Sequence, residues 1–90
     1  MKGSIGSNVE TLYNIIRGEV EAAEFIISGE SEITEAPLSK LKFRENVLIA
    51  AILRDNKVII PRGYDVIMPG DRVVVVSKEL ALRDITDILK

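Results

Sequence analysis

The side chains in this 90-residue chain with the clearest capacity for chemistry belong to Arg54, Arg62 and Arg72, each beside an aliphatic run. A guanidinium group can hold a carboxylate or phosphate through two parallel hydrogen bonds. In one interpretation these arginines bind an anionic effector at a dimer interface, and Asn46 or Asn56 adds hydrogen bonds. In the other they form structural ion pairs or are solvated. For Arg54 we favour a pair with Asp55 or another acid.

Enzymatic chemistry is poorly supported, because the chain has no histidine and no cysteine. The commonest general base and the best nucleophile are therefore absent. No Gly-x-Ser-x-Gly or Ser-x-x-Lys motif occurs in a strand–helix context. No Gly-x-Gly-x-x-Gly follows a strand, so no dinucleotide cradle is readable. We expect a non-enzymatic domain with no catalytic residue and no cofactor held in this part of the chain.

Acidic residues concentrate between positions 19 and 35, where every one of them is a glutamate. A hard cation such as calcium needs several converging oxygen ligands. No loop here has metal-ligand spacing, and strand alternation places Glu21 and Glu24 on opposite faces. We therefore favour a solvated acidic face and expect no metal site.

Charge and hydropathy exclude several further classes of function. The net charge is −2 and the pI about 5.1, with basic and acidic residues interspersed, which disfavours binding to nucleic acid or to anionic membranes. The longest apolar run, residues 47–53, is far short of the roughly 20 residues of a transmembrane helix. The chain is 47% hydrophobic but only 4% aromatic. Such an excess of aliphatic surface on a small chain predicts a homodimer.

The aliphatic runs predict a four-stranded sheet. Alternation in the first run places Ala23, Phe25 and Ile27 on one side. The second run is apolar on both faces, as in a central strand. The expected strands are residues 20–28, 47–54, 57–61 and 72–76.

Turn residues set the ends of these strands. Asp55 and Asn56 both tolerate positive φ, so they predict a two-residue hairpin turn between the second and third strands. Pro61 cannot donate to a ladder and ends the third strand. Gly70 follows a proline and suits a type II turn, while Asp71 is expected to cap backbone amides.

Helical spacing of apolar residues predicts helices at residues 8–17 and 79–89, with a one-turn helix at residues 38–41. The predicted fold class is therefore α+β, a small four-stranded sheet containing a β-hairpin and flanked by two to three short helices. Residues 8–90 form a single domain in this interpretation. Residues 1–7 are expected to be a flexible N-terminus or the remnant of an expression tag.

Between Asn46 and Ser77, aliphatic strands alternate with Arg54, Pro61, Asp65, Gly70 and Asp71 in that order. This pattern resembles the C-terminal domain of the TrkA and RCK family, the regulatory subunits of potassium channels and transporters. The resemblance runs from about residue 9 to residue 89. It implies a cytoplasmic, effector-sensing domain that acts as a dimer on a membrane-embedded potassium transporter subunit, at the inner face of the cell membrane.

The resemblance also implies an effector. Relatives that bind cyclic di-AMP hold it between paired C-terminal domains, with polar residues just ahead of the strand equivalent to residues 47–53. Lys42 and Asn46 lie in that region here, and Arg54 and Arg62 complete the set of candidate ligand-binding residues. Some family members respond to calcium, so a divalent cation is the other candidate effector.

Two alternatives remain open at this stage. The module is reused, so it could serve another ion antiporter or a transcription regulator. It could also be a structural dimerisation module with no ligand. One departure from the family is the sequence Glu35-Ala36-Pro37, where relatives commonly carry glycine and a basic residue.

Overall fold

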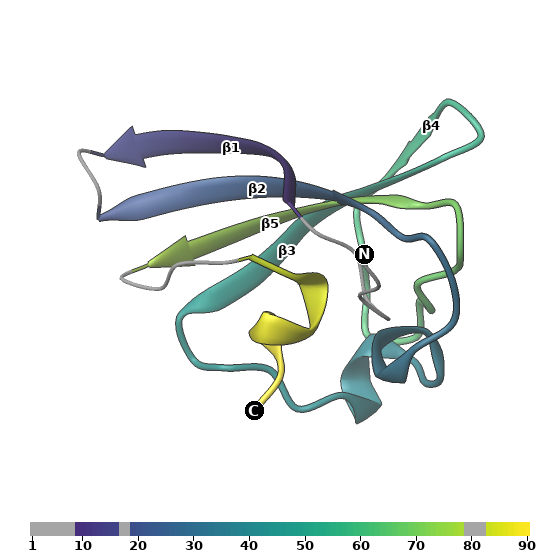
Figure 1. Ribbon diagram of the computed structural model, residues 1–90. Coiled ribbons are helices and arrows are strands. Elements are labelled where there is room, and N and C mark those ends of the chain that lie inside the picture. Colours follow the sequence, from purple (N-terminus) through teal and green to yellow (C-terminus); the bar gives the residue numbers. More distant parts are fainter. Residues whose placement is uncertain (1–8, 17–18, 79–82) are drawn as a thin grey trace.

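A five-stranded antiparallel sheet forms the body of the domain, and short turns close one of its faces (Figure 1). The computed structural model describes residues 9–16, 19–78 and 83–90, so the expected N-terminal segment 1–7 lies outside the described residues. The strand order is β1-β2-β5-β3-β4. The strands are β1 (Val9–Ile16), β2 (Val20–Ile26), β3 (Val47–Arg54), β4 (Lys57–Ile59) and β5 (Arg72–Lys78).

The valine strand β5 lies at the centre of the sheet, between β2 and β3. Val73 pairs with Phe25 on one side and Ile52 on the other, and all three side chains are fully buried. Cross-strand partners project to the same face, so this row and its neighbours two residues away form the core side of the sheet. The prediction that Ala23, Phe25 and Ile27 share one side is confirmed, and that side is the buried one.

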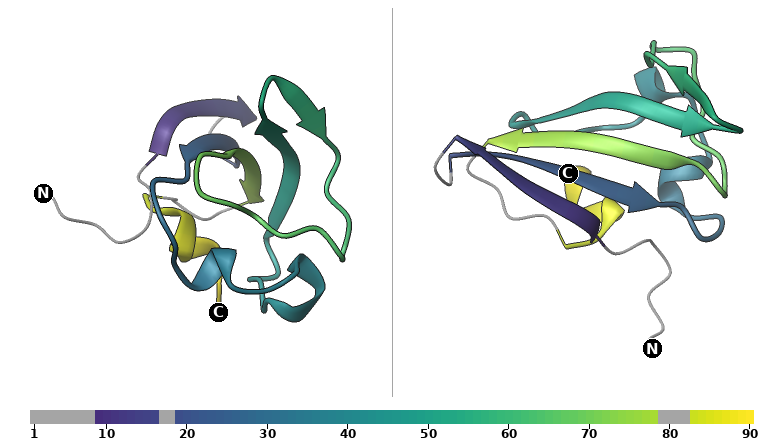
Figure 2. Two further views of the ribbon diagram at one scale, coloured as in Figure 1. Left: turned by 90° about the vertical axis from the view of Figure 1, so that its right-hand side faces the viewer. Right: turned by 90° about the horizontal axis from the view of Figure 1, so that it is seen from above.

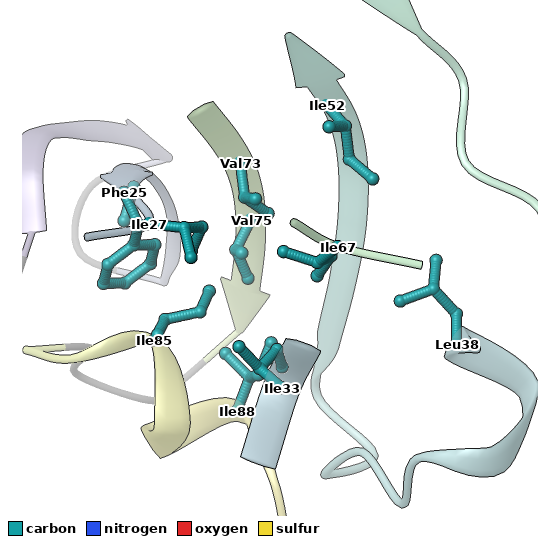
Figure 3. Packing of buried hydrophobic residues seen from close by; sticks show 11 residues of the cluster. Phe25, Ile27, Ile33, Leu38, Ile52, Ile67, Val73, Val75, Ile85 and Ile88 are labelled. Atoms are coloured by element: carbon teal, nitrogen blue, oxygen red, sulfur yellow. The ribbon is translucent and has the colours of Figure 1, made fainter. Parts of the chain in front are cut away.

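The core lies between this face of the sheet and the turns beneath it. The sheet curls around it, as the end-on view of Figure 2 shows. Figure 3 shows Val73, Val75 and Ile52 from the sheet meeting side chains of the opposing turns. The buried residues contributed by these turns are Ile33, Leu38, Ile67, Ile85 and Ile88.

The expected turns are confirmed by their backbone geometry. Asp55 and Asn56 have φ of 52° and 63°, and Arg54 pairs with Lys57 across the hairpin. Both values lie in the left-handed region that a type I′ turn requires. Gly70 has φ of 93°, and the Asp71 amide donates to the Met68 carbonyl at 3.1 Å. This is the geometry of a type II turn with glycine at its third position.

The helix expected at residues 8–17 is wrong, because Val9–Ile16 forms strand β1 and pairs antiparallel with β2. An isolated helix of this length is marginal in water. The open edge of β2 offers backbone hydrogen bonds instead, and the β-branched residues of the segment suit a strand. The sheet therefore has five strands rather than four.

Of the helix expected at residues 79–89, residues 79–82 lie outside the described residues. Over the remaining part, residues 83–89, the expected helix is wrong. A 3-10 helix, η3, spans Ile85–Ile88. Asp84 caps its N-terminus, because the Asp84 carboxylate accepts a hydrogen bond from the Thr86 amide at 3.1 Å. Leu89 is extended and forms an isolated β-bridge with Phe43. This bridge and the Asp84 cap compete with a continuous helix.

Two further 3-10 turns are η1 (Glu32–Thr34) and η2 (Leu38–Lys40). The second confirms the one-turn helix expected near Leu38, whereas η1 was not predicted. Within the described ranges the helical elements are all 3-10 turns of three or four residues. The α+β class is therefore corrected to an antiparallel sheet with short 3-10 turns.

Candidate functional site

Arg54, the principal candidate ligand contact, is engaged by a neighbouring acid within the fold. Its Nε donates to Oδ1 of Asp71 at 2.9 Å, and its Nη2 donates to Oδ2 at 2.7 Å. The same Nη2 donates to the carbonyl of Val66 at 2.8 Å. The expected pairing with an acid is confirmed. The partner is Asp71, however, and not the adjacent Asp55.

The carboxylate of Asp71 is buried, with 2% of its side chain exposed, and it serves more than Arg54. Its Oδ2 also accepts the Met68 amide at 2.9 Å, so the predicted capping of a backbone amide is confirmed. A buried charge is tolerated only when it is paired and hydrogen-bonded. The hydrogen bond with Asp71 raises the pKa of Arg54, against the opposing influence of burial. The pair fastens the end of β3 to the loop that leads into β5.

Asn46 lies at the opposite end of β3 from Arg54. The strand has eight residues, which places its ends about 23 Å apart. The two predicted site residues therefore cannot share one small-molecule site within a single copy. The other two candidates are also dispersed: Arg62 is exposed and its amide donates to Asp65, and Lys42 is exposed in the segment before β3.

A shallow hollow of about 290 Å³ opens beside Asn46, where β2 and β3 begin and β5 ends. Its lining combines aliphatic residues with Asn46, the basic Lys78 and the acidic Glu45. We call it the Asn46 hollow. It has the chemistry to hold a small ligand with an apolar part and an anionic or hydrogen-bonding part. Its lining is Val20, Glu45, Asn46, Val47, Leu48, Val76, Ser77 and Lys78.

Lys78 is the basic residue of this hollow, and it was not among the candidates predicted from the sequence. It pairs with Val20 of β2, and its amide donates to the Asn46 carbonyl at 2.8 Å. The available signal was its position two residues after the last valine of the run, just beyond the end of the expected strand. That signal becomes informative only once the register between β3 and β5 is known, since 32 residues separate Asn46 from Lys78.

The side of the sheet away from the core is unusually apolar. One row consists of Ala22, Val76 and Leu48, and the next two contain the ion pair between Glu24 and Arg72 at 3.4 Å. An antiparallel sheet covered on one side normally presents polar residues on the other. We call this surface the outer face, and Figure 2 shows its strands from above. Its residues are Ala22, Glu24, Ile26, Leu48, Ala51, Leu53, Arg72, Val74 and Val76.

Residues 22–90, which make up more than half of the chain, match the TrkA-C domain family. The chain belongs to the TrkA-C domain family. This is a family of regulatory, non-enzymatic domains, so the absence of an enzymatic function expected from the sequence agrees with the family.

Two curated relatives resemble this chain along its whole length, and a third resembles part of it. It is 36% identical over 90 residues to Trk system potassium uptake protein TrkA homolog 2 of Methanosarcina mazei, and 34% identical over 90 residues to TrkA homolog 1 of the same organism. A TrkA homolog of Archaeoglobus fulgidus is 39% identical over 61 residues, or 68% of this chain and 14% of that protein. Both M. mazei alignments include 100% of this chain, but the chain spans only 20% of the length of each M. mazei protein.

The described part of the TrkA-C domain offers neither a metal site nor a membrane-spanning helix. No three acidic side chains there converge in a way that could hold a metal ion. None of its helices has the length and hydropathy needed to cross a membrane. The Asn46 hollow is our candidate binding site for an effector.

Proposed function

We propose that this TrkA-C domain is the effector-sensing part of a potassium uptake system, and that it acts as a homodimer on a membrane transporter. The names of its M. mazei relatives support the potassium role. The Asn46 hollow is the observation that supports the sensing role, because its lining combines aliphatic residues with polar and charged ones. In this proposal the domain is cytoplasmic and sits at the inner face of the cell membrane through its transporter partner.

The proposed homodimer forms through the outer face. Leu48 is 65% exposed, and the half-buried Val74 and Val76 lie beside it on the neighbouring strand. Two sheets can pack face to face through such aliphatic surfaces. Glu24 and Arg72 give the surface one charge of each sign, so a second copy can meet it without like charges opposed.

The Asn46 hollow adjoins this seam, which supplies a mechanism. Leu48 and Val76 line the hollow and also belong to the outer face. A ligand in the hollow therefore contacts residues of the proposed dimer interface. Binding would favour one relative orientation of the two copies, and that shift in population would be passed to the transporter.

Cyclic di-AMP is the effector we propose first, and a divalent cation is the alternative. The ammonium of Lys78 and the amide of Asn46 suit a phosphate and a base edge. Arg54 was a candidate contact, but its Nε and Nη2 are already held by Asp71 and Val66. We therefore place the proposed effector site at Asn46 and not at Arg54.

Isothermal titration calorimetry with cyclic di-AMP, ATP, NADH and calcium tests the sensing role. Lys78→Ala should weaken binding of an anionic effector by about 1.5–3 kcal/mol, the loss expected for a charged hydrogen bond. Lys57→Ala is the matched control. Lys57 is an exposed lysine at the start of β4, where it pairs with Arg54 at the end of β3 remote from the hollow. Absence of heat with every ligand on the parent protein would contradict sensing by this domain.

A structural dimerisation module with no ligand is the second candidate function. The aliphatic outer face favours it, because dimerisation alone would explain that surface. A dimer in sedimentation together with a negative effector screen would select this alternative.

A further inference from the structure

A second hollow, of about 540 Å³, lies at the other end of the sheet from the Asn46 hollow. One wall is the segment that follows β2, with Glu30, Thr34 and Glu35. The opposite wall is the aliphatic segment Val66, Ile67, Met68 and Pro69, which leads into β5. We call it the acidic hollow.

Hydrogen bonds join the two walls of the acidic hollow at one end and hold the backbone of one wall in place. The Gly70 amide donates to the Ile27 carbonyl at 2.7 Å, and the Ile27 amide donates to the Asp71 carbonyl at 2.9 Å. These two bonds join the chain entering one wall to the chain leaving the other. Arg54 holds Val66 by its carbonyl, and Asp71 holds Met68 by its amide. A preformed apolar hollow binds with less loss of conformational entropy than one that must be ordered.

The charged residues that line the acidic hollow, Glu30 and Glu35, are both acidic. The segments 28–39 and 63–71 contain five acidic residues and no lysine or arginine. Asp71 is neutralised by Arg54, and the Asp65 carboxylate accepts the Arg62 amide. Glu30 and Glu35 are exposed, and within the described residues neither forms an ion pair. They line the hollow together with the aliphatic wall, in which Met68 is 49% exposed.

We propose that the acidic hollow docks a short segment of a partner protein that combines lysine or arginine with aliphatic side chains. The aliphatic groups would cover Met68 and Val66, and the cations would pair with Glu30 and Glu35. Opposite charges around an apolar patch direct a partner to one register. Cytoplasmic loops of membrane proteins are rich in lysine and arginine, so the transporter of the proposed function is a suitable source. That attribution rests on the proposed function, whereas the chemistry of the hollow does not.

Methionine methyl NMR on the whole chain tests the docking surface directly. The chain has two methionines, Met1 and Met68, and Met68 lines the hollow. The probe is a six-residue peptide of alternating lysine and leucine, capped at both ends. The Met68 methyl resonance should shift on titration, and the shift should weaken as salt is added. A peptide with glutamate in place of lysine should leave it unchanged.

The double substitution Glu30→Gln and Glu35→Gln should weaken binding of the lysine–leucine peptide about five- to tenfold, as expected for two partly exposed ion pairs. Glu19→Gln with Glu21→Gln is the matched control, since it changes the net charge equally but lies outside the hollow. Thermal melts of both variants should match the parent and so show that folding is intact.

Three results would overturn the proposal. They are a Met68 resonance that does not move, equal affinity in the Glu30/Glu35 variant, and equal binding of the glutamate peptide. A Met68 shift on dilution of the protein alone would assign the hollow to a second copy instead, and would also overturn it. None of these results bears on calorimetry at the Asn46 hollow, so failure of the two proposals can be told apart.

Discussion

Replacing Arg54 with alanine should destabilise this small domain severely, although Arg54 is partly exposed and lies next to a surface hairpin. The substitution removes both hydrogen bonds to the Asp71 carboxylate and the bond to the Val66 carbonyl. Asp71 would keep only the Met68 amide as a partner among those described. With 2% of its side chain exposed, it has little access to water in compensation.

The magnitude follows from which partner is left behind. Breaking a buried ion pair by removing one member costs roughly 3–5 kcal/mol. The Arg54 side chain is 31% exposed, so water can enter the vacated space and solvate part of the charge. We therefore expect a loss of about 2–4 kcal/mol in the free energy of unfolding, which is a large share of the roughly 5–15 kcal/mol typical of a folded domain.

Urea unfolding followed by circular dichroism measures this loss. Arg72→Ala is the matched control, because Arg72 adjoins Asp71 in sequence but forms a wider, more exposed ion pair with Glu24. That pair should contribute no more than about 1 kcal/mol. A double-mutant cycle with Asp71→Asn then isolates the coupling between Arg54 and Asp71.

An unfolding free energy for Arg54→Ala within about 0.5 kcal/mol of the parent would refute this reasoning. It would show that the pair is solvated in solution and that the guanidinium is free to hold a ligand. The same result would return Arg54 to the list of effector contacts.

Three further predictions concern single positions. Gly70→Val should cost about 1–3 kcal/mol, because φ of 93° is strained for a branched residue; a thermal melt should show this loss and little for Gly29→Ala, whose added Cβ meets nothing within 4 Å. Asn56→Gly should raise the urea midpoint, by up to about 1 kcal/mol in stability, because glycine suits the positive φ of the hairpin turn better; a lower midpoint would contradict this. Leu48→Lys should convert a dimer into a monomer in sedimentation at tens of micromolar, whereas Tyr64→Lys, at an exposed position away from the outer face, should not; a parent that is already a monomer would refute dimerisation.

The parts of the fold set by local geometry could be predicted from the sequence. Asp55 and Asn56 specify their hairpin because few residues tolerate positive φ, and Gly70 specifies its turn for the same reason. The valine run of β5 predicted a strand, because β-branched residues favour an extended backbone. These signals act over two to seven residues, so no knowledge of distant partners is needed.

Tertiary pairing decided the parts that could not be predicted. The apolar residues of Val9–Ile16 fit a helical stripe, yet the free edge of β2 makes the segment a strand. Arg54 and Asp71 are 17 residues apart, and no spacing rule joins them before β3 and β5 are known to be neighbours. The Asn46 hollow depends in the same way on the register that brings Lys78 beside Asn46. The sequence therefore indicated Asn46 as a candidate but not the residues around it.

The two proposed binding surfaces lie at opposite ends of the same strands, and this arrangement makes their coupling measurable. β3 begins at the Asn46 hollow and ends at Arg54, whose guanidinium holds Val66 in the wall of the acidic hollow. A shift of β3 along its axis would therefore reach both hollows. If an effector and a basic peptide are coupled through it, each must change the affinity of the other by the same factor. Peptide titrations with and without the effector, and effector titrations with and without the peptide, should give equal ratios; ratios of one in both directions would show that the strands transmit nothing between the two ends.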